Sequence, residues 1–362
     1  MKILILAENY PHPSHPETQA FIHTRNIFYQ SKGLDFSVIS FRANEAYEID
    51  GIKVFPPSII SAINSVDLCI SHAPNIRNHI RFLKKHLRKI HKILFVFHGY
   101  EALYTKNRSI APDRKLSRHF AKYLANILYD VIKIPLLKSS IKKLKDRLPV
   151  HSVIVSESLL DDMVKDMGCS EGFFRPFSII NNPINPIFNE KSYSYKGNED
   201  IICIRSLDDK KYGADLFIEL ARKTTDRNFH LFGKGSAYKG VPMPENLTII
   251  QQFFRAEDIV NLLDKYKAGI LFTRWDSQGI LACEFAAYGI PLITSDLPIC
   301  HEMLKDYPNV AFVSNNLDFD LNTILKEIPQ ATEKNIRFTY EETAQQELNL
   351  IYDILKDSTC VV

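Results

Sequence analysis

The sequence lacks the features that mark secreted and membrane-spanning proteins. Its six cysteines are scattered, and no two of them form a Cys-x-x-Cys pair. This spacing argues against a zinc site and against a disulfide framework, and it fits a reducing cytosol. No apolar run approaches the roughly 18 residues needed to span a bilayer. The first residues, MKILILAENYPHP, are only a short apolar stretch ended by polar and proline residues. We therefore expect no signal peptide, no transmembrane helix and a cytoplasmic location.

The chain is long enough for two domains. It has 362 residues, of which 45% are hydrophobic and 24% charged, an ordinary globular composition. Strand-like and helix-like segments alternate twice, first from KILILAE to HSVIVSES and again from IICIRS to PLITSD. Each alternation predicts a parallel sheet with helices on its faces. We expect a Rossmann-like first domain at 1–185, a Rossmann-like second domain at 186–337 and a final amphipathic helix within 338–362.

The most informative stretch is RWDSQGILACEFAAYGIPLITSD, residues 274–296. It follows the predicted strand AGILFT, so it lies at the carboxyl end of a parallel sheet, where such sheets bind ligands. A helix begins near Ile280, and its free N–H groups can hold a phosphate, which Gly279 allows to approach closely. Glu284 lies about one turn further and can accept hydrogen bonds from sugar hydroxyls. A small-residue packing helix with a solvated Glu284 is the alternative that spacing alone leaves open.

The same stretch resembles the E-x7-E signature of retaining family 4 glycosyltransferases, which have the GT-B fold. Here the signature reads D-x7-E, with Asp276 in the first carboxylate position and Glu284 in the second. The segments IRSLDDKKYGADLFIEL, FGKG, VIVSES and IINNPINPIF are similar to further segments of that family, so the resemblance extends over most of the chain. The N-terminal segment NYPHPSHPETQAF departs from the family, which often has paired glycines there.

The resemblance implies two doubly wound domains that face each other across a cleft, with the last helix crossing back to the first domain. It implies transfer of a sugar from a nucleotide sugar, with retention and without a metal or further cofactor, and it favours a UDP-sugar over a GDP-sugar. The acceptor would be a glycan or a lipid-linked sugar in bacterial surface polysaccharide or glycoconjugate synthesis. The alternative is a catalytically inactive GT-B subunit that binds another glycosyltransferase.

The resemblance also assigns roles to residues of the donor site. Arg205 and either Lys210 or Lys211 would neutralise the leaving diphosphate. One extra residue before Gly213 leaves the choice of lysine open. Asp276 would contact a donor sugar hydroxyl and Glu284 the ribose. The remaining contacts are the loop beside the base and the backbone amides at the start of a helix: Gly233, Gly279, Ile280 and Leu281.

His98 is the main candidate in the first domain. It follows the apolar segment ILFVF, and in the family a histidine at a comparable strand end contacts the donor sugar. A strand-end histidine satisfied by a backbone carbonyl is the alternative, and His72 has the same placement with a weaker case. Glu101 and Glu17 are candidates for the acceptor side.

Positive charge is concentrated in one part of the chain. Residues 77–147 hold nineteen Lys and Arg against four acids, a local balance of +15, although the whole chain carries only +3. A helical stripe from Ile76 to Ile90, and two amphipathic pieces divided by Pro135, run through this region. The pattern favours an anionic membrane surface over a solvated face. Nucleic acid is not expected, because no interleaved aromatics or known binding module are evident.

Overall fold

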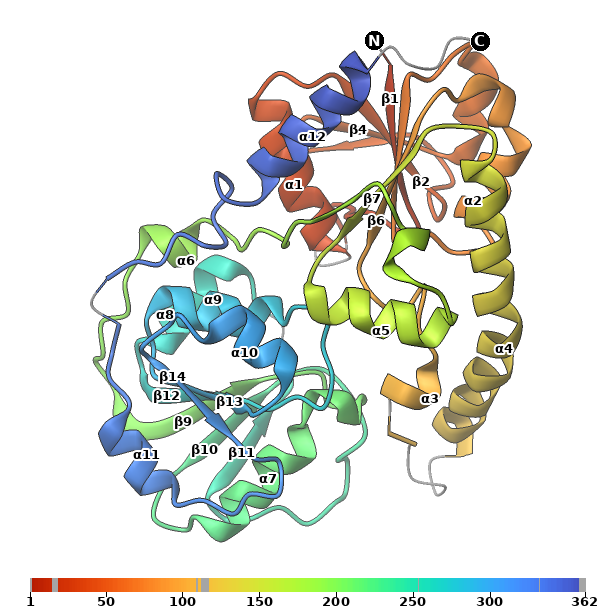
Figure 1. Cartoon of the computed structure of the whole chain (residues 1–362). Helices are drawn as coiled ribbons and strands as arrows, with labels where there is room; N and C mark the ends of the chain where they lie inside the picture. The colour runs from red at the N-terminus through yellow and green to blue at the C-terminus, as the bar shows by residue number, and fades with distance from the viewer. Residues whose placement is uncertain are drawn as a thin grey trace. The chain divides into compact units, whose positions relative to one another are not determined.

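The computed structural model describes residues 2–14, 19–108, 110–111, 117–252, 254–331 and 333–357 (Figure 1). The chain divides into two compact units. The first comprises Met1–Thr105, Leu124–Pro183 and Tyr340–Val362, and the second comprises Lys106–Tyr123 and Ile184–Thr339. Against the expected ranges 1–185 and 186–337, residues 106–123 group with the second unit.

The first unit is built on a sheet with the strand order β3-β4-β2-β1-β5-β6-β7-β8. All neighbouring pairs are parallel except β3 with β4. Parallel strands buried on both faces are nearly continuous apolar runs, as in ILILA and ILFVF. The strands are β1 (Ile3–Ala7), β2 (Phe36–Ser40), β3 (Tyr47–Ile49), β4 (Ile52–Phe55), β5 (Leu68–His72), β6 (Ile93–Phe97), β7 (Val150–Ile154) and β8 (Phe177–Ile179).

The second unit has an all-parallel sheet with the strand order β11-β10-β9-β12-β13-β14. Its strands are β9 (Asn198–Ile204), β10 (Phe229–Phe232), β11 (Leu247–Ile250), β12 (Tyr266–Leu271), β13 (Leu292–Ser295) and β14 (Val310–Val313). Two parallel α/β units with helices on both faces of each sheet confirm the fold class expected from the alternating pattern.

Helices cover the faces of both sheets. In the first unit α1 and α12 lie on one side and α2 and α4 on the other, and in the second α8, α9 and α10 lie opposite α7 and α11 (Figure 1). The helices are α1 (Ala20–Ser31), α2 (His79–Lys85), α3 (Thr105–Arg108), α4 (Ser117–Lys145), α5 (Glu157–Met167), α6 (Ile187–Glu190), α7 (Ala214–Lys223), α8 (Ala256–Leu263), α9 (Ile280–Tyr288), α10 (Pro298–Leu304), α11 (Leu321–Glu327) and α12 (Ala344–Lys356).

The last helix belongs to the first unit, as expected. Its apolar face, Ala344, Leu348, Ile351 and Ile354, is buried in the same core cluster as β1 and α1. The amino group of Lys92 donates hydrogen bonds to the carbonyl oxygens of Ile354 and Asp357, 2.5 and 2.7 Å away, at the C-terminal end of α12. A cation beside unpaired helix carbonyls stabilises that end.

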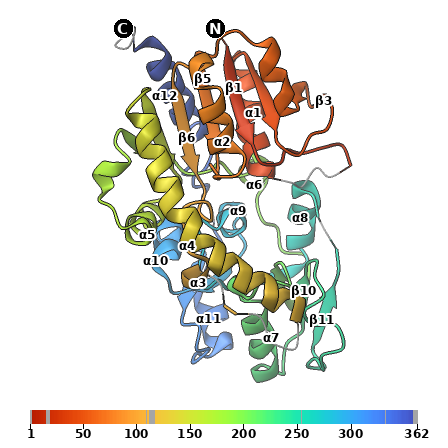
Figure 2. The same ribbon diagram turned by 90° about the vertical axis from the view of Figure 1, so that its right-hand side faces the viewer.

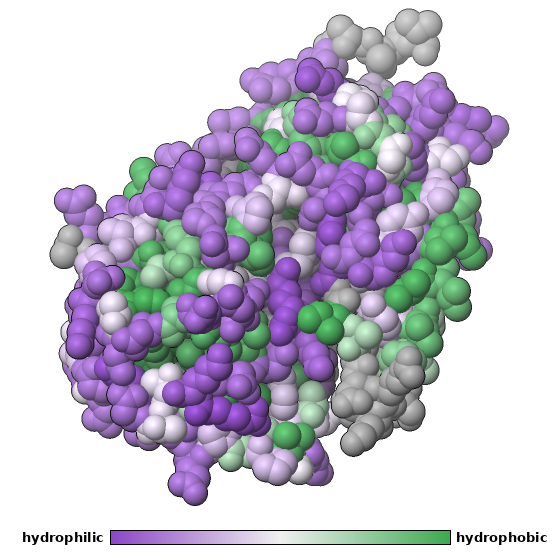
Figure 3. All heavy atoms as spheres, turned by 60° about the horizontal axis from the view of Figure 1, so that its bottom comes forward, coloured by the Kyte–Doolittle hydropathy of each residue, from purple (hydrophilic) through white to green (hydrophobic). Residues whose placement is uncertain are grey.

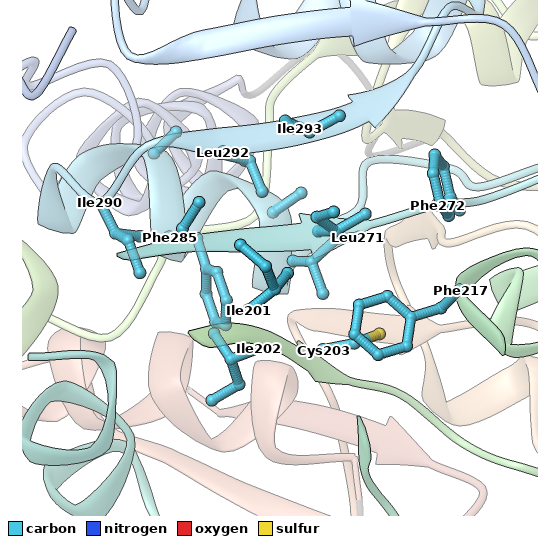
Figure 4. Packing of buried hydrophobic residues seen from close by; sticks show 14 of the residues in the cluster. Ile201, Ile202, Cys203, Phe217, Leu271, Phe272, Phe285, Ile290, Leu292 and Ile293 are labelled. Carbon is cyan, nitrogen blue, oxygen red and sulfur yellow. The ribbon is translucent and has the colours of Figure 1, made fainter. Parts of the chain in front are cut away.

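The small residues of α9 let this helix pack closely on the second sheet. A side chain at Gly269 of β12 would come within 2.6 Å of the Phe285 ring, so glycine leaves room for that ring against the strand. Figure 4 shows Phe285 reaching from α9 toward the core residues of β9 and β12. Ala282, Ala286 and Phe285 are all buried. This packing fixes the direction of α9 and therefore the position of its N-terminus.

Two local expectations need correction. The stripe from Ile76 to Ile90 is not one helix: α2 ends at Lys85, and a short 3-10 turn follows at Leu87–Lys89. Conversely, α4 continues through Pro135, where a division into two pieces was expected. Pro135 is on an exposed face of the helix, so water can satisfy the carbonyl that its missing N–H leaves unpaired.

Candidate functional site

The candidate donor site lies at the carboxyl edge of the second sheet. Ile204 of β9 pairs with Phe232 of β10, and β12 is the neighbour of β9 on its other side. Because all three strands are parallel, the residues that follow them meet at one edge. These residues are Arg205 after β9, Gly233 after β10 and the segment 273–279 after β12.

Gly233 allows β9 and β10 to stay together at this edge. The N–H of Arg205 donates to the carbonyl oxygen of Phe232 at 2.9 Å, and the N–H of Gly233 donates to that of Ile250 at 3.1 Å. A side chain on Gly233 would lie 1.8 Å from the carbonyl oxygen of Arg205. Only glycine fits, so the predicted Gly233 is required by the backbone that carries Arg205.

Arg205 is a buried cation whose hydrogen bonding is incomplete. Only 8% of the residue is exposed, and its Nη2 is 3.5 Å from the carbonyl oxygen of Leu271. Its Nε is buried and has no hydrogen-bond acceptor among the described residues. The guanidinium carbon lies 5.6 Å from the centre of the Tyr212 ring. A buried unpaired donor on a permanent charge is costly, and an anionic ligand would satisfy it.

The two candidate lysines differ in burial. They belong to a 3-10 turn, Lys210–Tyr212, that Asp209 caps by accepting the N–H of Lys211 at 3.0 Å. Lys211 is only 5% exposed, and its Nζ lies 4.3 Å from the Tyr212 ring centre and 5.4 Å from that of Trp275. Lys210 is half-buried, and its carbonyl oxygen accepts a hydrogen bond from Arg274 at 2.5 Å.

The segment after β12 is tied to this turn. The N–H of Arg274 donates to the carbonyl oxygen of Lys211 at 2.7 Å, as does the Thr273 hydroxyl at 3.2 Å. The Arg274 guanidinium binds both carboxylate oxygens of Asp215, at 2.7 and 2.9 Å. Sequence reasoning did not anticipate Trp275, Tyr212 or the Arg274–Asp215 pair. Trp275 could have been suspected, because it is the single tryptophan of the chain and directly precedes Asp276.

Asp276 and Gly279 shape the entry to α9. Oδ1 of Asp276 accepts the N–H of Ser277 at 2.8 Å, which closes a local turn. Gly279 is the N-cap of α9 with φ 74°, a conformation that favours glycine. No side chain among the described residues caps this helix, and the half-buried Ile280 and Leu281 form its first turn. Amide groups at an uncapped N-terminus are suited to bind an anion.

Glu284 lies one turn further along α9 and is half-buried. Its Oε1 accepts the N–H of Asn185 at 3.3 Å. Burial raises the pKa of this carboxyl to about 7, and the hydrogen bond from Asn185 opposes the shift in part. The structure therefore places Arg205, Lys211 and Asp276 at the carboxyl edge of the second sheet. Gly279 lies at the start of α9, the helix that follows β12, and Glu284 lies one turn into it.

His98 is part of a histidine pair in the first unit. It follows β6, and its Nε2 lies 3.1 Å from Nδ1 of His72 at the end of β5. Burial, and then the charge of Arg25, lower the pKa of both histidines well below 6.5. The His98 ring also packs against Phe21, with ring centres 4.5 Å apart. Both imidazoles are therefore neutral at pH 7.

Glu101 accepts hydrogen bonds from the backbone that follows β6. One of its oxygens accepts the N–H groups of His98 and Gly99, at 2.5 and 3.0 Å. Burial raises the pKa of Glu101, whereas these backbone hydrogen bonds lower it. Glu101 therefore fixes the conformation of the residue that follows β6. Glu17, the other acceptor-side candidate, lies outside the described residues.

The described residues contain neither a cluster of metal-ligating side chains nor a helix suited to span a membrane. No group of three or more His, Cys, Asp and Glu side chains in this part of the chain could hold a metal ion. None of the helices there is both long and apolar enough to cross a bilayer.

The whole chain is similar to known enzyme structures. No protein-family model and no curated protein sequence matches it. Sucrose-phosphate synthase from Thermosynechococcus elongatus matches at 10% identity with a TM-score of 0.69, over 99% of this chain and 100% of that one. A glycosyltransferase from Rickettsia africae matches at 15% identity with a TM-score of 0.63, over 99% of both chains. These structures have the GT-B architecture.

The chain has the GT-B fold. The catalytic domain of starch synthase IV from Arabidopsis thaliana, bound to ADP and acarbose, is a third similar structure. It shares 11% identity with a TM-score of 0.61 and covers 98% of this chain and 99% of that one. At such low identity the likeness establishes the fold and leaves the activity to the chemistry of the site.

Proposed function

We propose that this protein is a glycosyltransferase that binds a nucleotide sugar in its second unit and transfers the sugar to a hydroxyl group. The observation that carries the proposal is Arg205, a buried guanidinium at the carboxyl edge of the sheet whose Nε has no acceptor among the described residues. Lys211 is buried in the 3-10 turn that follows, and no side chain in the described part of the chain caps the N-terminus of α9. Together these groups suit a diphosphate.

The chemistry needs positive charge where the diphosphate leaves. The bond between the anomeric carbon and the diphosphate breaks, the diphosphate takes the electron pair, and the acceptor oxygen bonds to that carbon and loses its proton. Arg205 and Lys211 would stabilise the leaving group, together with the N–H groups of 279–281. Lys210, being half-buried and at the edge of the same turn, would have a lesser part.

The other predicted contacts complete the donor site. Glu284 would accept hydrogen bonds from the ribose, Asp276 from a donor sugar hydroxyl, and Gly233 would leave room beside the base. His98 would contact the donor sugar as a neutral imidazole. We propose transfer with retention and without a metal, from a UDP-sugar in preference to a GDP-sugar, because these properties accompany the signature that residues 276–284 resemble.

The acceptor follows from the same resemblance and from the charge pattern. We propose a glycan or lipid-linked sugar in bacterial surface polysaccharide or glycoconjugate synthesis, and a cytoplasmic protein held peripherally on the inner face of the plasma membrane. An inactive subunit that only binds another glycosyltransferase would have no need of a buried Arg205 whose Nε lacks an acceptor among the described residues. Arg205 and Lys211, the two groups proposed to hold the diphosphate, therefore favour an active enzyme.

A thermal-shift screen with UDP-, GDP-, ADP- and CMP-sugars tests this proposal. A ligand present at 100 times its dissociation constant stabilises the folded protein by about 2.7 kcal/mol. We expect one nucleotide class to raise the melting temperature and that class to be turned over. Arg205→Ala should reduce turnover on the order of a hundredfold or more. Lys239→Ala, which removes an exposed cation from the same unit, is the matched control. Turnover unchanged in Arg205→Ala would refute the site assignment.

A further inference from the structure

Helix α4 is apolar on two opposite faces. Its inner face, Ile134, Leu137, Ile141 and Leu144, is buried in the first unit. Its outer face carries five further large apolar residues, which we name the outer stripe: Leu124, Leu128, Val131, Ile132 and Leu136. Their exposed fractions are 44, 70, 61, 59 and 50%. Apolar helix faces are normally buried, and none of the described residues covers the outer stripe.

The outer stripe is an unusual concentration of exposed apolar surface. The described residues include nine exposed large hydrophobics, and five of them form this stripe. Spacings of four, three, one and four residues place them on one side of a helix. Figure 2 shows α4 facing the viewer, and Figure 3 shows hydrophobic atoms gathered on the side where α4 lies in Figure 1. Contiguous apolar surface of this kind marks an interaction site.

Basic residues continue the same face toward the C-terminal end of the helix. Lys138 and Lys142 are four residues apart and follow the outer stripe in helical register. An open groove begins here, lined by Pro135, Lys138, Ser139, Lys142, Lys145, Asp146 and Phe173. Within α4 the sequence has a single acid, Asp130, and it is buried against Lys133 at 2.7 Å. The outer face of α4 therefore combines aliphatic side chains with lysines and has no acid of its own.

We propose that α4 docks on an anionic lipid surface. The outer stripe enters the boundary between headgroups and acyl chains, and Lys142 and Lys143 bind lipid phosphates. The amino group of Lys138 instead donates to the carbonyl oxygens of Met167 and Gly168, at 3.0 and 2.6 Å. A second copy of the chain fits less well. Two such helices side by side would set lysines against lysines or against aliphatic side chains, because the single acid within α4, Asp130, is buried against Lys133. A soluble glycan would leave five aliphatic side chains in water.

The charge pattern assigned the membrane contact to residues 77–147 as a whole, and this inference places it on α4. Two lysines between Ile76 and Ile90, Lys84 and Lys89, already make hydrogen bonds within the fold. Lys84 donates to the Ser140 hydroxyl at 2.7 Å. Lys89 donates to the carbonyl oxygens of Ile60 and Ile63, at 3.0 and 2.7 Å. The helix that keeps exposed apolar and basic groups together is α4. The inference rests on the membrane location in the proposed function and names the element that makes the contact, whereas donor binding does not require it.

Vesicle binding by the full chain tests the proposal. Vesicles of phosphatidylcholine alone, and of phosphatidylcholine with phosphatidylglycerol, are sedimented with the wild type and with variants. We expect binding only to the anionic vesicles. Both Leu128→Ser/Ile132→Ser and Lys142→Gln/Lys143→Gln should lower the apparent affinity about tenfold or more. All four positions are exposed, so melting temperatures should be unchanged.

Matched controls come from the second unit. Val241→Ser/Ile336→Ser removes two other exposed apolar side chains, 44 and 60% exposed, and Lys239→Gln/Lys305→Gln removes two other exposed charges. Both controls should bind vesicles as the wild type does. Equal binding to neutral and anionic vesicles, no binding to either, or unchanged binding by Leu128→Ser/Ile132→Ser would overturn the proposal. So would a wild-type dimer that becomes monomeric in that variant while vesicle binding is absent. A failure of donor binding would leave these results unaffected.

Discussion

Arg25 and Glu347 form a fully buried ion pair between α1 and α12. Arg25 Nε lies 2.8 Å from Glu347 Oε2, neither side chain is exposed, and 322 residues separate them in the chain. Arg25 Nη1 also donates to the side-chain oxygen of Asn182. The pair therefore joins the last helix of the chain to the first one.

Breaking this pair should destabilise the first unit strongly. Glu347→Leu leaves Arg25 buried without its counter-ion, which typically costs about 3–5 kcal/mol, and Arg25→Met strands the carboxylate in the same way. The double variant Arg25→Met/Glu347→Leu should be much less destabilised than the sum of the two, because it buries no unpaired charge. Denaturant unfolding of the three variants measures this coupling. Additive losses would show that the two side chains act independently.

The fold could be predicted because each sheet is made of apolar strands separated by helices, and burial on both faces fixes that pattern locally. The hairpin of β3 and β4 was missed, although Asp50 and Gly51, both with positive φ, supply the two-residue turn that such hairpins favour. The length of α2 was overestimated because helical spacing was extended through Leu87 to Ile90. There the chain instead forms a bridge between Ile90 and Val66.

The candidate site was only partly predictable, for a different reason. Arg205, Gly233 and Glu284 stand in segments whose spacing resembles a known family, so their positions could be inferred. The choice between Lys210 and Lys211 could not, because it depends on how the 3-10 turn buries one side chain and not the other. The contact of Lys211 with Trp275 joins residues more than sixty positions apart, and no local pattern indicates it.

Gly233→Ala should damage the donor site. The new Cβ would meet the carbonyl oxygen of Arg205 at 1.8 Å, so the backbone that carries the guanidinium must shift. We expect a loss of stability of about 1–3 kcal/mol and nucleotide binding weakened at least about tenfold, since a displacement near 1 Å at such a site has effects of this size. Gly240→Ala is the control: it strains the backbone through the positive φ of Gly240, 75°, but its new Cβ has open space around it. Similar nucleotide affinity in both variants would count against the role of this backbone.

Donor affinity should depend on the ionisation of Glu284. The pKa of this carboxyl is raised to about 7, and ribose hydroxyls donate hydrogen bonds best to the ionised form. Binding of a nucleotide sugar should therefore strengthen as the pH rises, by about tenfold between pH 6 and pH 8. Calorimetric titration at several pH values measures the trend. Glu284→Gln should bind more weakly and without this pH dependence, and a slope that persists in it would assign the titration to another group.

Chelators should not abolish transfer. In the proposed site the charge of the leaving diphosphate is met by Arg205, Lys211 and the N-terminus of α9, which supply fixed positive groups without an ion. Sugar transfer with and without EDTA, followed by addition of Mg²⁺ or Mn²⁺, measures the effect. Complete loss that only a divalent cation restores would mean that the leaving group is stabilised differently.

The comparison of a nucleoside diphosphate with its monophosphate tests the central claim most directly. If Arg205 binds the diphosphate, the wild type should bind UDP at least about tenfold more tightly than UMP, since a charge-assisted contact to the second phosphate contributes about 1.5–3 kcal/mol. Arg205→Met should lose most of this preference and keep its affinity for UMP. If the screen identifies another base, the corresponding pair of nucleotides replaces UDP and UMP. An unchanged preference for the diphosphate in Arg205→Met would contradict the account.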